Sequence, residues 1–83
     1  KDFEISIKTH LKGEIWDKHY HKLATEYNYV ISGAVEINGI TYKEKDLFVI
    51  YPNFVVDPNF IEDCSIMCVK TPSAIGDKFN IER

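Results

Sequence analysis

The chain has 83 residues, of which 45% are hydrophobic and 28% charged, and its formal net charge is −3. This length supports one small core, so we expect a single domain over residues 1–83, with a barrel core at about 3–70 and an irregular tail at 71–83. The charges are interspersed and form no basic stripe, which argues against nucleic-acid binding. The apolar runs are too short to cross a bilayer, and we expect a cytoplasmic protein with no membrane partner.

The predicted elements are short strands. Phe3, Ile5 and Ile7 alternate with polar residues, which is the period of a half-buried strand. Five further segments are rich in Val, Ile, Tyr and Phe and are separated by turn residues: 26–32, 34–38, 40–43, 46–51 and 64–70. The pattern predicts an all-β fold, a small antiparallel β-barrel or sandwich. The tail from Thr71 is assigned no regular structure.

One turn and one pair of cysteines allow local structural predictions. Asn38-Gly39 lies between two apolar segments, and a type I′ turn favours such a pair because both central residues need positive φ, so a tight hairpin is expected. Cys64 and Cys68 would lie about 13 Å apart along a strand, which exceeds disulfide reach. Both are therefore predicted to be reduced core thiols, as in a cytosolic protein.

The candidate metal-binding residues begin at His19-Tyr20-His21. If residues 15–21 form a strand, Ile15, Asp17 and both histidines share one face, and the two imidazoles point the same way. Glu26, at the start of the next predicted strand, would supply a carboxylate across a hairpin. Imidazole and carboxylate ligands suit divalent Fe, Mn, Zn or Ni, so a transition-metal site is predicted without a choice among these metals.

The spacing of these residues resembles a family motif. Gly13, five residues, His19-x-His21, four residues, Glu26, six residues and Gly33 match the first motif of the cupins at every position. The second cupin motif is only partly present: Pro52 matches, whereas Asp57 occupies the position of its histidine. The resemblance implies a cupin jelly roll, or double-stranded β-helix, with His19, His21 and Glu26 as metal ligands. Asp57 is a fourth ligand by position only.

Two functions follow from this resemblance. In the first, a metal-dependent enzyme acts on a small polar metabolite, as a sugar or sugar-phosphate isomerase or epimerase does, with Tyr29 or Asp57 as acid or base. In the second, the barrel binds a carbohydrate-like ligand without catalysis, or serves as a dimerising accessory domain, with a degenerate metal site. In that case His19 and His21 are a polar lining, and Asp57 caps the turn before Pro58.

A second copy of the chain is the other expected partner. A barrel this small leaves apolar strand surface uncovered and exposes strand edges that need protection. Small cupins that the sequence resembles are usually dimers. We therefore predict a homodimer that binds a small-molecule ligand.

Overall fold

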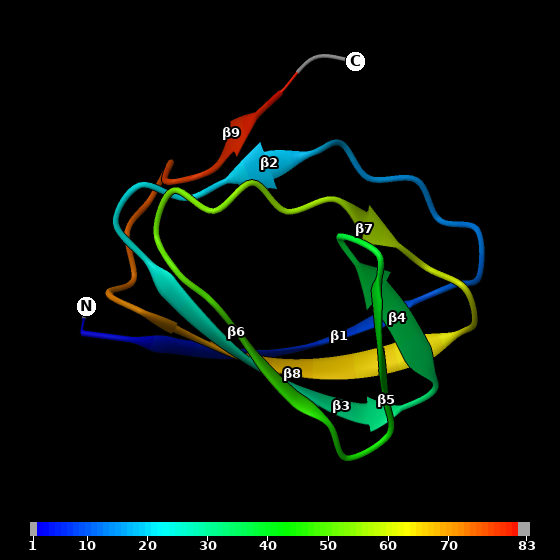
Figure 1. The fold of residues 1–83 in the computed structure, drawn as a ribbon. Helices are drawn as coiled ribbons and strands as arrows, with labels where there is room; N and C mark the ends of the chain where they lie inside the picture. The colour runs from blue at the N-terminus through cyan, green and yellow to red at the C-terminus, as the bar shows by residue number, and fades with distance from the viewer. Residues whose placement is uncertain (1, 82–83) are drawn as a thin grey trace.

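A computed structural model describes residues 2–81 of the chain, and every regular element in this range is a β-strand. Figure 1 shows the strands curving around a common interior, with the longest ones at the bottom of the view. The elements are β1 (Glu4–His10), β2 (His19–Tyr20), β3 (Thr25–Ser32), β4 (Ala34–Ile37), β5 (Ile40–Lys43), β6 (Leu47–Ile50), β7 (Pro58–Asn59), β8 (Cys64–Thr71) and β9 (Phe79–Asn80). Within residues 2–81 no helix is long and apolar enough to cross a membrane.

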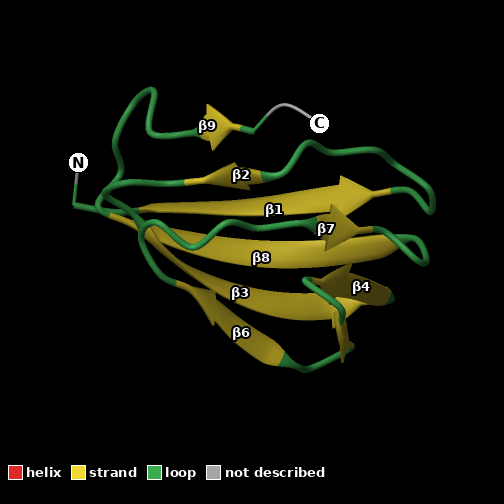
Figure 2. Cartoon of the chain, turned by 45° about the horizontal axis from the view of Figure 1, so that its top comes forward, coloured by secondary structure: helices red, strands yellow, loops and turns green. Residues whose placement is uncertain are grey.

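The strands form three antiparallel groups. The largest is a four-stranded sheet in the order β1-β8-β3-β6, which forms one wall of the barrel. A three-stranded sheet, β5-β4-β7, and the short pair β2-β9 complete the other sides. Figure 2 shows the four strands of this sheet side by side, with β2 and β9 above them. The non-consecutive strand order is that of a jelly roll, as the sequence predicted.

The apolar core lies at one end of the interior. Val30 and Val35 are fully buried at its centre, and Ile37, Phe48 and Phe60 pack around them. Gly33 joins β3 to β4 where the chain passes close to the loop before β8. A Cβ at this position would lie 1.9 Å from the carbonyl oxygen of Asp63, and φ is +76°, so only glycine fits. This close approach packs the β3–β4 turn against the neighbouring backbone.

Most of the predicted strands are present. The segments at 26–32, 34–38, 40–43, 46–51 and 64–70 correspond to β3, β4, β5, β6 and β8, each within two residues at either end. The Asn38-Gly39 hairpin is confirmed, since both residues have positive φ and Ile37 pairs with Ile40. Cys64 and Cys68 are free thiols on β8. Cys64 belongs to the buried core as predicted, whereas Cys68 is only partly buried and lines the interior cavity instead.

Two local predictions differ from the structure. Residues 15–21 are strand only at His19–Tyr20, which pairs with β9 and forms one bridge to Val56 rather than a hairpin with β3. The tail is not wholly irregular, because Phe79–Asn80 forms β9. Strands of two residues have no measurable period, so the sequence pattern gives no sign of them. Residues 82 and 83 of the predicted tail lie outside the described residues.

Candidate functional site

The barrel interior contains a cavity of about 340 Å³. One end is apolar, where it borders the core, and the other end is lined by polar side chains from the inner face of the four-stranded sheet. These polar residues come from β1, β3 and β8: Glu4, Ser6, Lys8, Glu26, Asn28, Cys68 and Lys70. Trp16 and His19 line the same cavity from the segment before β2 and from β2 itself. A volume of this size suits a small molecule.

A charged row crosses the sheet at the polar end. Strand register places Glu4, Lys70 and Glu26 side by side on β1, β8 and β3. The Lys70 Nζ atom lies 3.6 Å from Glu4 Oε1 and 3.6 Å from Glu26 Oε2. The side chains of Glu26 and Lys70 are largely buried, so the ammonium offsets the charge of the carboxylate in an environment that water screens poorly. The row offers both hydrogen-bond acceptors and a donor to the cavity.

Asn28 lies in the next row toward the core, opposite Cys68 on β8. Its side chain is buried, with 6% of the residue exposed, and it borders the cavity. The Nδ2 amide group makes no hydrogen bond with any residue among 2–81. A buried amide without a partner is unfavourable by about 1–3 kcal/mol, so such groups in native proteins usually have a bound molecule or a functional role.

His19 and His21 are both buried, and each ring is oriented through its Nδ1 atom. His19 Nδ1 donates to the carbonyl oxygen of Asp17 at 3.0 Å, and His21 Nδ1 donates to the carbonyl oxygen of Asp77. The Nε2 atoms are thereby left for other contacts. The two rings lie 5.5 Å apart between centroids and are nearly perpendicular. This use of backbone carbonyls to fix a histidine tautomer is common behind metal-binding imidazoles.

His21 Nε2 lies 3.2 Å from Glu26 Oε2. Because Nδ1 carries the proton of the neutral ring, Nε2 would direct a lone pair at the carboxylate oxygen. A proton on Nε2, or a cation bound by both atoms, removes that repulsion. Two ligands of one metal at about 2.1 Å and at right angles to each other lie about 3 Å apart, so the His21–Glu26 spacing suits a shared metal ion.

The segment that holds His21 is fixed by Asp77. Its carboxylate accepts hydrogen bonds from the backbone N–H groups of Lys22, Leu23 and Ala24 at 2.9–3.2 Å. Burial acts to raise the pKa of Asp77, but the three N–H donors and His21 outweigh it and hold the pKa below its ordinary value. Asp77 thus binds the turn between β2 and β3 through its side chain and orients His21 through its carbonyl oxygen.

Burial also changes the protonation of groups around the cavity. It lowers the pKa of His19, although the hydrogen bond to Asp17 opposes the shift, and this favours a neutral ring. Burial also lowers the pKa of Lys78, and the nearby ammonium groups of Lys8 and Lys70 lower it further. Burial raises the pKa of the Cys68 thiol to about 11. The Lys78 Nζ atom lies 4.3 Å from the centre of the Trp16 ring, a cation–π contact beside the cavity.

The predicted metal ligands are only partly brought together. His21 and Glu26 are in contact, and His19 stands beside His21 and lines the cavity. Over residues 2–81, however, no three His, Cys, Asp or Glu side chains are placed closely enough to hold a metal ion together. Lys70 also contacts the Glu26 oxygen that faces His21. The ligand chemistry of His21 and Glu26 therefore fits a divalent metal, whereas a third and fourth ligand are not in place.

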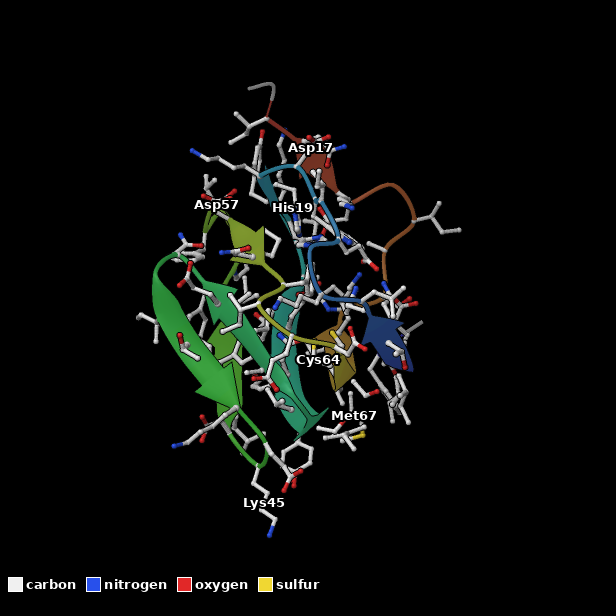
Figure 3. The ribbon with its side chains drawn as sticks, turned by 90° about the vertical axis from the view of Figure 1, so that its right-hand side faces the viewer. Asp17, His19, Lys45, Asp57, Cys64 and Met67 are labelled. Atoms are coloured by element: carbon white, nitrogen blue, oxygen red, sulfur yellow. The ribbon has the colours of Figure 1, made fainter. Side chains whose placement is uncertain are left out.

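Asp57 and Tyr29 do not join these residues. Val56 and Pro58 line the cavity, so the alternating chain directs Asp57 to the other side, where it borders a second depression with Glu36. Figure 3 shows Asp57 beside β7 and apart from His19. Tyr29 lies on β3 between Asn28 and Val30, which face inward, and so belongs to the outer face of the sheet. Neither residue contacts the cavity as a fourth ligand or a proton donor would.

Three residues of the site were not predicted from the sequence: Asn28, Lys70 and Asp77. Asn28 lies two residues after Glu26 on β3, and Lys70 pairs with Glu26 from β8, so a correct strand register would have placed both in the interior with Glu26. Asp77 has no such signal. It lies more than 50 residues from the backbone groups that it binds, in a segment with no period.

No family model matches the sequence, and the search of curated proteins also gave no match. Solved structures do resemble it. An uncharacterized conserved protein with a double-stranded β-helix domain from Klebsiella pneumoniae is 24% identical over 99% of this chain and 76% of that one, with a TM-score of 0.81. A cupin protein from Bacteroides fragilis is 22% identical over 92% of this chain and 72% of that one, with a TM-score of 0.71.

A third structure carries a ligand. A variant of Streptomyces PAC13 solved with uridine is 14% identical over 98% of this chain and 69% of that one, with a TM-score of 0.80. At these identities the comparisons show the fold. The chain has the double-stranded β-helix fold of the cupins, as the spacing of its first motif predicted.

Proposed function

We propose that the chain binds a small, uncharged polar molecule of the nucleoside or sugar type in its barrel cavity. The observation that carries this proposal is the buried Nδ2 group of Asn28, which borders the cavity and has no partner among residues 2–81. An amide N–H group in this position requires an acceptor, and a ligand carbonyl or hydroxyl oxygen supplies one.

The charged row indicates the character of the ligand. Lys70 offsets the carboxylates of Glu4 and Glu26, so the polar end of the cavity has no large excess of either charge that would demand an ionised ligand. Carboxylate oxygens accept from ligand hydroxyl or imide N–H groups, and the Lys70 ammonium donates to ligand oxygens. The opposite end of the cavity is apolar, with Phe48 and Phe60 in its lining, and suits the face of a ring.

The uridine bound to the PAC13 variant supports a nucleoside as the first probe. Uridine has imide and hydroxyl groups for the polar end and a flat ring for the apolar end. Calorimetry with uridine, thymidine, ribose and a sugar phosphate should give saturable binding for at least one compound that carries no phosphate. The absence of saturable binding for all of them at millimolar concentration would exclude the proposal.

Two substitutions locate the ligand. Asn28→Leu removes the unpartnered amide with little change in volume, and Lys70→Met removes the ammonium. Each should weaken binding about 10-fold to 100-fold, because one buried hydrogen bond is lost, and the larger loss is expected for the charged donor. Tyr29→Phe, on the outer face of the same sheet, is the matched control and should leave the dissociation constant unchanged. Equal effects of all three substitutions would place the ligand elsewhere.

A second candidate function is binding of divalent Fe, Mn, Zn or Ni by His21, Glu26 and His19. It is favoured by the short His21–Glu26 spacing and by the two Nδ1 atoms, which donate to backbone carbonyls and leave Nε2 for a metal. A metal held there would act as a Lewis acid on a ligand oxygen in the cavity. The chain's own residues would hold the ligand through Asn28 and orient both imidazoles.

The test of this candidate uses untagged protein freed of metal by a chelator. Titration with each ion should give one site per chain in the native protein and in His10→Ala, and none in His21→Ala. His10 is a suitable control because its Nδ1 atom binds Glu14 and its ring stacks on Phe60. Lys70→Met should bind the metal more tightly, since the ammonium repels a cation at Glu26. Equal, weak binding by all four proteins would argue against a metal site.

A further inference from the structure

The outer face of the four-stranded sheet exposes two complete rows of apolar and aromatic side chains. Strand register aligns each row across all four strands in the order β1-β8-β3-β6. The first row consists of Ile5, Val69, Tyr27 and Val49, and the second of Ile7, Met67, Tyr29 and Leu47. Figure 3 shows Met67 on the side of the sheet that faces away from His19.

These side chains are accessible to solvent in the single chain. Ile5 is 59% exposed, Ile7 65% and Leu47 69%, although residues of this kind are normally buried. Hydroxyl residues flank the rows: Thr9 and Ser65 share a hydrogen bond of 3.1 Å at one end, and Thr25 pairs with Thr71 at the other. Across the outward positions of these four strands there is no charged residue, in a chain of which 28% is charged.

The two faces of the sheet thus show an unusual distribution of charged and apolar side chains. The charged row of Glu4, Lys70 and Glu26 faces the cavity, whereas Ile and Leu face solvent. A sheet with one buried face normally has the reverse pattern. An apolar outer face that crosses every strand is larger than the scattered apolar residues of an ordinary surface, and patches of this size mark interaction sites.

We propose that a second copy of this chain covers this outer sheet face. A twofold dimer places each surface against an identical one, so any charge on the contact would meet its own copy. The two rows carry no charge and meet themselves without repulsion. Two such sheets pack face to face at about 10 Å, with their side chains interdigitated.

The size of the face is sufficient for a stable dimer. Five of the eight side chains are 40–69% exposed and the other three are partly buried, so the two rows together present roughly 700 Å². This is close to the area of about 800 Å² that one partner contributes to a standard interface. The hydroxyl pairs at either end provide a polar rim, and Tyr27 and Tyr29 lie at the centre, where aromatic residues contribute most to binding. The chain's net charge of −3 lies on other surfaces.

The test is the mass in solution, measured by light scattering and by sedimentation from 1 to 200 µM. The native chain should have twice its mass of 9.6 kDa. Ile7→Lys and Leu47→Glu each place a charge in the second row and should weaken the dimer at least 100-fold, which gives monomers at 1 µM. Ile75→Glu is the matched control, since Ile75 is fully exposed outside the sheet, and it should remain a dimer.

The folded state of each variant is checked by circular dichroism, and Ile7→Ser provides a neutral substitution should the charged one fail to fold. Because Ile7 and Leu47 are exposed in the single chain, all of these proteins should fold and differ only in mass. A native chain that is monomeric at 200 µM overturns the proposal. So does a dimer that survives both charged substitutions, or a native chain that associates only with lipid vesicles.

Discussion

Replacement of Asp77 by Asn tests how the tail holds the site. In the native chain, two carboxylate oxygens accept from the N–H groups of Lys22, Leu23 and Ala24. Asparagine keeps one acceptor oxygen and replaces the other with an NH₂ group, which faces a backbone donor. At least one N–H group of this partly buried turn then loses its partner, and the remaining bonds lose their ionic character.

The expected loss follows from these contacts. An unsatisfied buried N–H group costs about 1–3 kcal/mol, and bonds to a neutral acceptor are roughly half as strong as bonds to a carboxylate. We expect Asp77→Asn to lower the free energy of unfolding by about 2–3 kcal/mol at pH 7, or the Tm by about 10–20 °C for a domain of this size. Asp63→Asn is the control: Asp63 is exposed and accepts one bond, from Lys12 N–H, which Asn can also accept.

The dependence on pH gives a second readout. The pKa of Asp77 is lower in the folded chain than its ordinary value of 3.8. Its contribution is therefore complete above pH 3.8 and is lost as pH falls through the lower folded pKa. Urea unfolding at several pH values should show a constant gap between native and Asp77→Asn proteins near neutrality, which narrows below pH 3.8. A gap under 0.5 kcal/mol at pH 7, or one that persists unchanged in acid, would refute the assigned role.

Three further measurements test the fold and the cavity. Gly33→Ala should lower the free energy of unfolding by more than about 4 kcal/mol or prevent folding, because the new Cβ meets the carbonyl oxygen of Asp63. Its control is Gly39→Ala, which has open space at its Cβ and should lower the free energy of unfolding, measured in urea, by only about 1–2 kcal/mol. Asn28→Leu should raise the free energy of unfolding of the ligand-free chain by about 1–3 kcal/mol while it weakens ligand binding, and a destabilised variant would contradict the unpartnered amide. Cys68, with its pKa raised to about 11, should react with iodoacetamide at pH 8 roughly 100-fold more slowly than an unfolded thiol, and rapid labelling of the native chain would contradict its burial.

The strands and the family motif could be predicted because both depend on local spacing. The two-residue period identified β3 to β6 and β8, and Asn38-Gly39 identified the hairpin between β4 and β5. The fixed separations from Gly13 to Gly33 indicated the double-stranded β-helix fold. They also identified His21 and Glu26, which contact each other in the structure. These features need no knowledge of which face of a strand is inside.

The orientation of the strands was harder to predict. The alternation in β3 showed two faces, with Glu26 and Asn28 on one and Tyr27 and Tyr29 on the other, but it did not show which lines the interior. The usual rule places aromatic residues inside, whereas this sheet places the carboxylate and amide inside. The role of Asp77 depends on contacts across more than 50 residues, which no local pattern encodes.

The reversed orientation of this sheet links the two proposals. A single chain without ligand carries an unpartnered amide on the inner face and uncovered apolar rows on the outer face, and both are unfavourable. A ligand relieves the first and a second copy relieves the second, and neither acts on the unfolded chain. The Tm should therefore rise with protein concentration. It should rise again with ligand, which at a concentration 100 times its dissociation constant raises the free energy of unfolding by about 2.7 kcal/mol. In Leu47→Glu the dependence on protein concentration should disappear and the ligand effect should remain. In Asn28→Leu the dependence on protein concentration should remain, and the ligand effect at the same ligand concentration should fall to about 0.4–1.4 kcal/mol. A variant that loses both effects together would show that the two faces of the sheet do not act separately.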